Sequence, residues 1–374
     1  MGDVTAPLVV GVPREVKTDE HRVAITPDGV LEMRHHGVSV LVERAAGRGS
    51  GITDDDYRGA GAEIVEAAAD VWGRAGLVIK VKEPQQAELA FLRPDLVLFT
   101  YLHLAAYPEI ARALIDARTT GVAYETVQLA NGQLPLLAPM SEVAGRMAPQ
   151  IGAHLLERRQ GGRGVLLGGA PGVRPARVVV LGAGNVGWNA AWIAQGMEAE
   201  VLLLDKNIDR LRWVDQIHKG RIQTLASNRA AVARAVRDAD LVIGAVLVPG
   251  GRAPVLVSDD MISSMQPGAV IIDCAIDQGG TIEGIHETTH SDPVFVRHDV
   301  LHYAVGNVPG AVPNTSTYAL TNATLPYAVE LAIGGIGATT ADPALAAGVN
   351  TLNGTVTNPA VAEALGVPAA PLAR

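Results

Sequence analysis

The stretch Arg177-Val-Val-Val-Leu-Gly-Ala-Gly-Asn-Val-Gly187 decides how this chain folds. Its apolar first half predicts a buried strand, and the segment that continues to Gly196 predicts a helix. Gly182 permits a tight turn between the two, Gly184 lets the backbone approach a phosphate group, and Gly187 lets the helix pack closely on the strand. Glycines spaced in this way between a strand and a helix are typical of a nucleotide-binding βαβ unit.

The next predicted strand, Glu200–Leu204, leads to an acid that supports this interpretation. Asp205 lies 23 residues after Gly182, close to the spacing of about 20 expected of the acid that binds the ribose hydroxyls of a dinucleotide. Such a carboxylate accepts hydrogen bonds from the ribose diol and repels a 2′-phosphate, so NAD is favoured over NADP, although Lys206 would weaken that repulsion. A glycine turn without a ligand and a solvated aspartate at a strand end are the alternatives. We predict a nicotinamide dinucleotide site.

The composition is that of a globular protein without a basic surface. The chain has 374 residues, of which 48% are hydrophobic and 18% charged, enough for two ordinary domains. Its net charge of −9 argues against nucleic acid or a membrane surface as a partner, because both require a dense basic face. The single cysteine, Cys274, excludes an intrachain disulfide and a multi-cysteine metal site, and it fits a reducing compartment.

The sequence has no segment with the pattern of a secretory signal or a membrane span. Met1–Pro13 lacks the basic start of a secretory signal. The longest apolar runs, such as Leu241–Val248, have the length of a strand, whereas a spanning helix needs about 20 apolar residues. We therefore expect a cytoplasmic protein.

Short apolar runs alternate with helical segments in two successive sets, which predicts an α/β fold with two Rossmann-like domains and parallel sheets. The first set has predicted helices at Pro27–His36, Asp55–Ala62 and Tyr107–Ala117. The predicted strands of the two sets are Leu8–Val12, Val38–Val42, Leu77–Val81, Leu96–Thr100 and Val122–Tyr124, and then Arg177–Leu181, Glu200–Leu204, Leu241–Ala245 and Ala269–Asp273.

Two long helices are expected to join the domains around a central cleft. The first would begin with Ser141 as its N-cap and end at Gly161-Gly162, and the second would cover Thr315–Ile333. The predicted domains are a substrate domain from both chain ends, residues 1–137 plus 312–374, and an NAD-binding domain, residues 138–311. Beyond Gly334 the sequence carries little chemical signal.

Four polar residues are expected at strand ends or in the loops that follow strands. They are Arg22, Lys82, His103 and Asp277. Ligands of open α/β sheets bind at the carboxyl ends of strands, and two cations, an imidazole and a carboxylate would suit a small carboxylate substrate that needs proton transfer. Each has a plainer alternative: a solvated arginine, an exposed lysine of the pair Lys80 and Lys82, a core histidine, and a turn-capping aspartate. The pattern alone predicts only an NAD-dependent oxidoreductase of a small substrate.

Several segments, in order from about Val10 to Val329, resemble the alanine dehydrogenase family, which also contains the NAD-binding component of transhydrogenase. The segments are Arg22–Pro27, Lys80–Pro84, Phe99–Ala106, Val122–Val127, Leu134–Arg146, Ala275–Gly280, Val308–Pro313 and Thr315–Thr324.

The resemblance implies reversible NAD-dependent deamination of L-alanine to pyruvate and ammonia by a homohexamer. It implies that Arg22 and Lys82 hold the substrate carboxylate, that His103 is the general acid/base, and that Asp277 is a second catalytic group. The positions expected to line the NAD site are Ser141, Gly182, Gly184, Asn185, Val186, Gly187, Asp205, Arg210, Ser227, Val246, Leu247, Cys274, Ala275, Ile276, Asp277, Val305, Gly306, Asn307 and Val308.

The chain departs from the family pattern at three peripheral places. Ile285-His-Glu287 stands where the family often has Ser-Arg-Pro, Asn314 replaces a common lysine, and Lys206 replaces an apolar residue; these bear on NAD affinity. The nearest alternative is the transhydrogenase component, and the segment Ala138–Gly145 and the absence of a following hydrophobic span both favour alanine dehydrogenase. A lysine- or ornithine-linked relative and a non-enzymatic NAD sensor are further alternatives. No metal is expected, because His286 and His290 lie in a segment that is typical of a surface loop.

Overall fold

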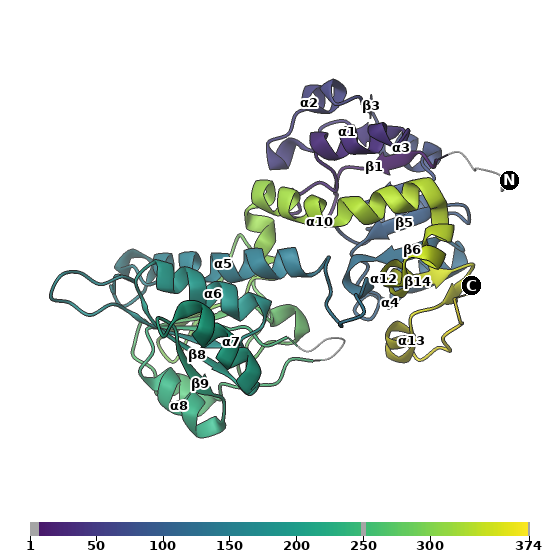
Figure 1. Cartoon of the computed structure of the whole chain (residues 1–374). Helices are drawn as coiled ribbons and strands as arrows, with labels where there is room; N and C mark the ends of the chain where they lie inside the picture. Colours follow the sequence, from purple (N-terminus) through teal and green to yellow (C-terminus); the bar gives the residue numbers. More distant parts are fainter. Residues whose placement is uncertain (1–6, 248–251, 373–374) are drawn as a thin grey trace. The chain divides into compact units, whose positions relative to one another are not determined.

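The computed structural model describes residues 7–247 and 252–372. Two compact units make up the chain, each with its own sheet. The terminal unit contains Met1–Met140 and Val312–Arg374, and the central unit contains Ser141–Ala311. The helix α5 (Ala138–Leu155) carries the chain from the first unit into the second (Figure 1). None of the described helices is both long and apolar enough to cross a membrane.

The terminal unit has an eight-stranded sheet in the order β15-β14-β6-β5-β4-β1-β2-β3. The first six strands of the chain pair with one another in parallel, whereas β14 is antiparallel to both of its neighbours, β6 and β15. From β1 the chain builds the sheet outward to β3, then returns to β4 on the other side of β1, so β1 and β4 flank a topological switch point. The strands are β1 (Val10–Val12), β2 (Val40–Glu43), β3 (Glu63–Val65), β4 (Leu77–Ile79), β5 (Val97–Thr100), β6 (Thr120–Ala123), β14 (Val349–Leu352) and β15 (Thr355–Val356).

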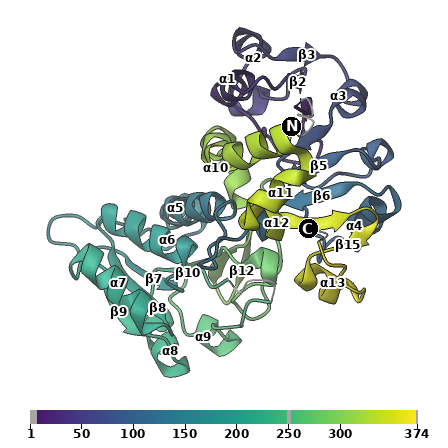
Figure 2. The same cartoon turned by 45° about the vertical axis from the view of Figure 1, so that its right-hand side comes forward.

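Helices cover this sheet around apolar cores. One core gathers Trp72 of α3, Leu114 of α4 and Val361 of α13 over Leu98 and its neighbours in the sheet. The helices α1 and α10 pack on each other, and α10 also contacts β4. Figure 2 shows the last strand and helix of the chain beside α4. The helices are α1 (Pro27–His35), α2 (Asp54–Gly59), α3 (Ala68–Arg74), α4 (Pro108–Asp116), α10 (Pro313–Gly334), α11 (Ala338–Ala341), α12 (Pro343–Gly348) and α13 (Pro359–Leu365).

The central unit has a seven-stranded sheet in the order β12-β13-β11-β10-β7-β8-β9. All its pairings are parallel except that of β12 with β13. The helices α6 (Asn185–Gly196) and α7 (Ile208–His218) contact β7, β8 and β9, whereas α8 (Arg229–Arg237) and α9 (Asp259–Ser263) enclose a separate apolar core. The strands are β7 (Arg177–Leu181), β8 (Glu200–Asp205), β9 (Gln223–Ala226), β10 (Leu241–Gly244), β11 (Val270–Asp273), β12 (Val294–Arg297) and β13 (Val300–Tyr303).

The α/β fold with two Rossmann-like sheets is confirmed, but both sheets are mixed rather than wholly parallel. Each contains an antiparallel hairpin that closes through two residues with positive φ. These are His298 and Asp299, at 53° and 58°, and Asn353 and Gly354, at 51° and 81°. Asn-Gly is the strongest sequence signal for such a turn. The hairpin at Asn353-Gly354 could therefore have been predicted from the sequence beyond Gly334, which was expected to carry little chemical signal.

The expected N-cap at Ser141 is wrong. The helix α5 begins at Ala138, because prolines are tolerated in a first helical turn and Pro139 therefore does not exclude helix there. It ends at Leu155, and a separate 3₁₀ turn covers Arg158–Gln160 before the two glycines.

Candidate active site

Three of the four predicted catalytic and substrate-binding residues follow neighbouring strands of the terminal sheet. Arg22 follows β1, Lys82 follows β4 and His103 follows β5. They therefore belong to the carboxyl edge of the sheet at its switch point, where open α/β sheets bind ligands. The fourth residue, Asp277, lies in the central unit.

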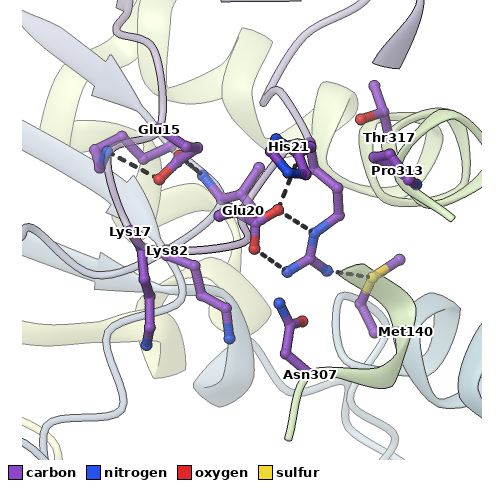
Figure 3. A network of polar contacts seen from close by, with 12 residues as sticks. Glu15, Lys17, Glu20, His21, Lys82, Met140, Asn307, Pro313 and Thr317 are labelled. Atoms are coloured by element: carbon purple, nitrogen blue, oxygen red, sulfur yellow. Dashed lines mark hydrogen bonds and ion pairs between the residues drawn. The ribbon is translucent and has the colours of Figure 1, made fainter. Parts of the chain in front are cut away.

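Arg22 is buried and held in a fixed orientation. Its side chain is 2% exposed. Nε donates to Oε1 of Glu20 at 2.7 Å and Nη2 to Oε2 at 2.5 Å, while Nη1 donates to the sulfur of Met140 at 3.0 Å (Figure 3). Burial would raise the pKa of Glu20, but its hydrogen bonds and charge contact with Arg22 hold the pKa below the usual value. The alternative of a solvated loop arginine is wrong.

Lys82 is a half-buried cation that lies near two other cations, Arg22 and Lys17, and near the carboxylates Glu83 and Glu20. Within the described part of the chain, its ammonium has no hydrogen bond or ion pair. Burial lowers the pKa of Lys82, and the nearby positive charges of Arg22 and Lys17 lower it further. Figure 3 shows the side chains of Lys17 and Lys82 extending the same way. An incoming anion would relieve this repulsion, so the position suits a substrate carboxylate.

Lys80, two residues earlier, is in the opposite situation. Its side chain is fully buried and lies between two carboxylates, 3.0 Å from Oε2 of Glu15 and 2.9 Å from Oε1 of Glu88. The other oxygen of Glu15 accepts the Val81 amide at 2.6 Å. The expectation that one lysine of the pair is exposed is therefore wrong: Lys80 is buried in ion pairs, and Lys82 is half-buried without one among the described residues.

His103 is fixed by its backbone and partly open at its ring. It has a positive φ of 48°, and its amide donates to Oε1 of Glu125 at 2.6 Å. The ring stacks on Tyr101 with centroids 5.6 Å apart, and its Nδ1 lies 3.8 Å from Oε2 of Glu83. Because the side chain is 37% exposed, the alternative of a core histidine does not fit. An imidazole in this setting can exchange protons with a ligand or water.

Sequence reasoning missed the carboxylates that organise these groups. Glu20, Glu83 and Glu125 pair with Arg22, His103 or its backbone, yet none was singled out. Glu83 stood inside a segment that resembles the family, directly after Lys82, which was the available signal. Glu125 likewise stood inside a resembling segment, Val122–Val127, whereas Glu20 comes from the loop after β1 and had no such signal.

The glycine turn of the central unit has the shape that a dinucleotide needs. Gly182 has a φ of 107°, which residues with a side chain rarely adopt. A Cβ at Gly187 would lie 1.8 Å from the carbonyl oxygen of Gly182, so helix and strand approach as closely as predicted. A Cβ at Gly184, the N-cap of α6, would meet no atom within 4 Å. This leaves open space at a helix N-terminus, where a pyrophosphate can bind.

Asp205 is oriented beside this turn. One carboxylate oxygen accepts the Ala183 amide at 2.6 Å, and the other accepts the Asn207 amide at 2.7 Å. Ser227, the next predicted residue along the chain, donates its amide to the Asp205 carbonyl at 2.9 Å. Each carboxylate oxygen keeps acceptor capacity, so the acid can still bind two ribose hydroxyls. The residues present fit a nicotinamide dinucleotide.

Most of the other expected cofactor residues also follow the carboxyl ends of central strands. Cys274 follows β11 directly, and burial raises the pKa of its thiol to about 12, which keeps it a neutral packing group. Asp277 is exposed in a 3₁₀ turn, Ile276–Gln278. Arg210 lies exposed in α7, and Ser141 lies in the first turn of α5. The remaining positions are Val246 and Leu247 after β10, Ala275 after β11, Val305, Gly306, Asn307 and Val308 after β13, and Asn185 and Val186 at the start of α6.

Two family models match the chain. The C-terminal domain of "Alanine dehydrogenase/PNT" matches residues 148–359, and the N-terminal domain matches residues 11–144. The chain belongs to the alanine dehydrogenase/PNT family. As a member it is an oxidoreductase, and the family implies a nicotinamide cofactor and small-molecule substrates.

Within this family, the chain is similar to several proteins named alanine dehydrogenase. An alanine dehydrogenase of Methanococcus maripaludis is 54% identical over 97% of the chain and 98% of its own length. One of Mycobacterium tuberculosis is 56% identical over 96% and 97%, respectively. A solved L-alanine dehydrogenase structure matches with a TM-score of 0.93 and 49% identity, covering 96% of this chain and 99% of that one.

A transhydrogenase structure from Sinorhizobium meliloti is also similar, but less so. It matches with a TM-score of 0.80 and 26% identity over 94% of this chain and 99% of its own. The alanine dehydrogenase assignment is therefore better supported than the transhydrogenase alternative.

Proposed function

We propose that this chain catalyses the NAD-dependent, reversible oxidation of L-alanine to pyruvate and ammonia. The observation that carries the proposal is the ammonium of Lys82, which has no ion pair among the described residues, beside the buried Arg22 at the switch point of the terminal sheet. A small carboxylate fits this arrangement, and relatives more than 50% identical are named alanine dehydrogenase.

The two cations have different tasks. Lys82 supplies the free positive charge for the substrate carboxylate and lies near the reacting carbonyl or imine. Arg22 is paired with Glu20 and adds little net charge. Its rigidly held guanidinium instead orients the substrate carboxylate. Together they fix the α-carbon in one place, and much of the rate enhancement should come from this positioning.

His103 moves the protons. A bound nicotinamide ring would accept the hydride from the α-carbon. Water then attacks the resulting iminium carbon, and His103 accepts a proton from that water and returns it to the amine nitrogen. As the C–N bond breaks and ammonia leaves, His103 accepts the hydroxyl proton of the carbinolamine, and the carbonyl of pyruvate forms. Asp277 is proposed to orient the water, or ammonia in the reverse direction.

Asp205 favours NAD over NADP, since its carboxylate accepts the ribose hydroxyls and repels a 2′-phosphate. The glycine turn from Gly182 to Gly187 would bind the pyrophosphate at the start of α6. The positions after β10, β11 and β13 would line the rest of the cofactor site. We also expect a homohexamer in the cytoplasm, and light scattering on the purified protein would test the assembly.

The first test is NADH formation from L-alanine and NAD at alkaline pH, in the wild type and in His103→Ala. We expect a clear rate in the wild type and a loss of about 100- to 10,000-fold in the variant, the usual contribution of a general acid–base. Activity that survives the substitution would remove His103 from the mechanism. A wild type that binds NAD but is inactive with alanine, and with pyruvate plus ammonia, would refute the proposed function.

A further inference from the structure

Glu83 carries a buried oxygen that no hydrogen bond satisfies. Its side chain is 3% exposed. Oε1 accepts hydrogen bonds from Lys17 Nζ at 2.6 Å and from Gln85 Nε2 at 3.1 Å. Oε2 is buried and has no hydrogen-bond partner within the described residues. A buried carboxylate oxygen without a hydrogen-bond donor destabilises the fold, so we expect a donor to approach Oε2.

A candidate donor is the ring of His103. Its Nδ1 lies 3.8 Å from Oε2, beyond hydrogen-bond length but within ion-pair range. The backbone of His103 is anchored by Glu125, and stacking on Tyr101 restricts the ring. A movement of less than about 1 Å would bring Nδ1 to the ordinary hydrogen-bond distance. The catalytic hydrogen bonds of ligand-free enzymes are often long in this way and shorten when substrate binds.

The charge state of Glu83 suits this contact. Burial by itself would raise the pKa of this carboxyl, but His103 and Lys17 together lower the pKa to about 2. Glu83 therefore stays an acceptor across the working range of an enzyme and does not compete for the transferred proton. A buried carboxylate that binds the far nitrogen of a histidine fixes the tautomer in serine proteases by the same physical principle.

We propose that Glu83 is a positioning residue that holds the proton of His103 on Nδ1, while Lys17 holds the other carboxylate oxygen in place. The lone pair of Nε2 is then available to accept a proton from water, as the proposed reaction requires. Lys82 and Glu83 are consecutive, so one short segment after β4 serves both the substrate carboxylate and the acid–base group. This inference rests on the acid–base role proposed for His103.

The kinetic test compares Glu83→Gln with a control, Glu43→Gln. The control also removes a buried carboxylate that pairs with a cation, Arg14, and it lies outside the site. We expect Glu83→Gln to lower kcat about 10- to 100-fold, part of what a general acid–base contributes, with a change of less than about threefold in KM for L-alanine. Glu43→Gln should retain kcat. Equal losses in the two variants, or a loss confined to KM, would overturn the proposal.

A double variant separates this inference from the proposed function. If Glu83 acts through His103, then His103→Ala with Glu83→Gln should be no slower than His103→Ala alone, because the contact is already lost. Losses that multiply would show an independent role and overturn the proposal. An inactive wild type would instead refute the proposed function.

A spectroscopic test needs no active variant. Long-range proton–nitrogen NMR of the wild type, with the His103 ring signals identified by their loss in His103→Ala, reports which nitrogen is protonated. We expect the form with the proton on Nδ1 to dominate in the neutral ring. A ring protonated mainly on Nε2 would overturn the proposal, whether or not Glu83→Gln folds.

Discussion

Two lysines separated by one residue should respond in opposite ways to the same substitution. Lys80 and Lys82 both follow β4, but among the described residues Lys80 forms ion pairs, with Glu15 and Glu88, and Lys82 forms none. Replacement by methionine keeps the length of either side chain and removes only its charge. The pair therefore tests whether Lys82 is kept for a ligand rather than for the fold.

The magnitudes follow from the two environments. Lys80→Met would leave two buried carboxylates without their cation, which costs about 3–5 kcal/mol. At about 2–4 °C per kcal/mol for a unit of this size, Tm should fall by roughly 6–20 °C. Lys82→Met would instead remove a repelled cation. Because Lys82 is only half-buried, water offsets most of that repulsion, and we expect a gain of about 1 kcal/mol, or roughly 2–4 °C.

Lys82→Met should lower activity although it raises stability. A hydrogen bond to a charged group contributes about 1.5–3 kcal/mol, so Lys82→Met should raise KM for L-alanine about 10- to 150-fold. Pyruvate with NADH should raise Tm of the wild type by mass action and should do so much less in this variant.

The assays are thermal unfolding followed by circular dichroism, and initial rates of NADH formation. A Lys82→Met variant that unfolds at lower temperature than the wild type would mean that the ammonium has a structural partner. An unchanged KM in a more stable variant would mean that the carboxylate binds elsewhere. Either result refutes the reasoning.

Further predictions concern pH and the cofactor site. Because burial and then the charges of Arg22 and Lys17 lower the pKa of Lys82, the unfolded chain binds more protons than the folded one between that lowered value and 10.5. The stability deficit of the wild type against Lys82→Met should therefore shrink as pH rises through this window, and a deficit that grows in urea titrations would contradict the sign. Gly187→Ala should lower the free energy of unfolding by about 1–3 kcal/mol or more, because the new Cβ meets a backbone oxygen. Gly184→Ala should leave Tm unchanged and weaken NAD binding about tenfold or more, as measured by calorimetry. Equal losses of Tm in the two variants would refute this contrast. Asp205→Asn should raise KM for NAD about 10- to 100-fold and narrow the preference over NADP, and an unchanged NAD/NADP ratio would remove Asp205 from selectivity.

The sequence by itself determined the parts of this protein that local backbone chemistry controls. The strand before Gly182, the helix after it and the close approach at Gly187 could be predicted because the absence of a side chain acts on its immediate neighbours. Asp205 lies at the end of β8 beside this turn for a similar reason, since one strand, one helix and one further strand have nearly fixed lengths. The Asn353-Gly354 hairpin belongs to this class too, although its signal was overlooked.

Charge pairing was decided only by the tertiary structure. Lys80 and Lys82 look alike in sequence, and nothing local distinguishes a neutralised lysine from one available to a ligand. The difference arises because the loop after β1 brings Glu15 to Lys80, whereas the carboxylates near Lys82, Glu20 and Glu83, are already paired with Arg22 and Lys17. Glu83 meets His103 because β4 and β5 are neighbours in the sheet. Electrostatic interactions act through space between segments far apart in the chain, so the protonation and pairing of these groups follow from strand order rather than from the residues beside them.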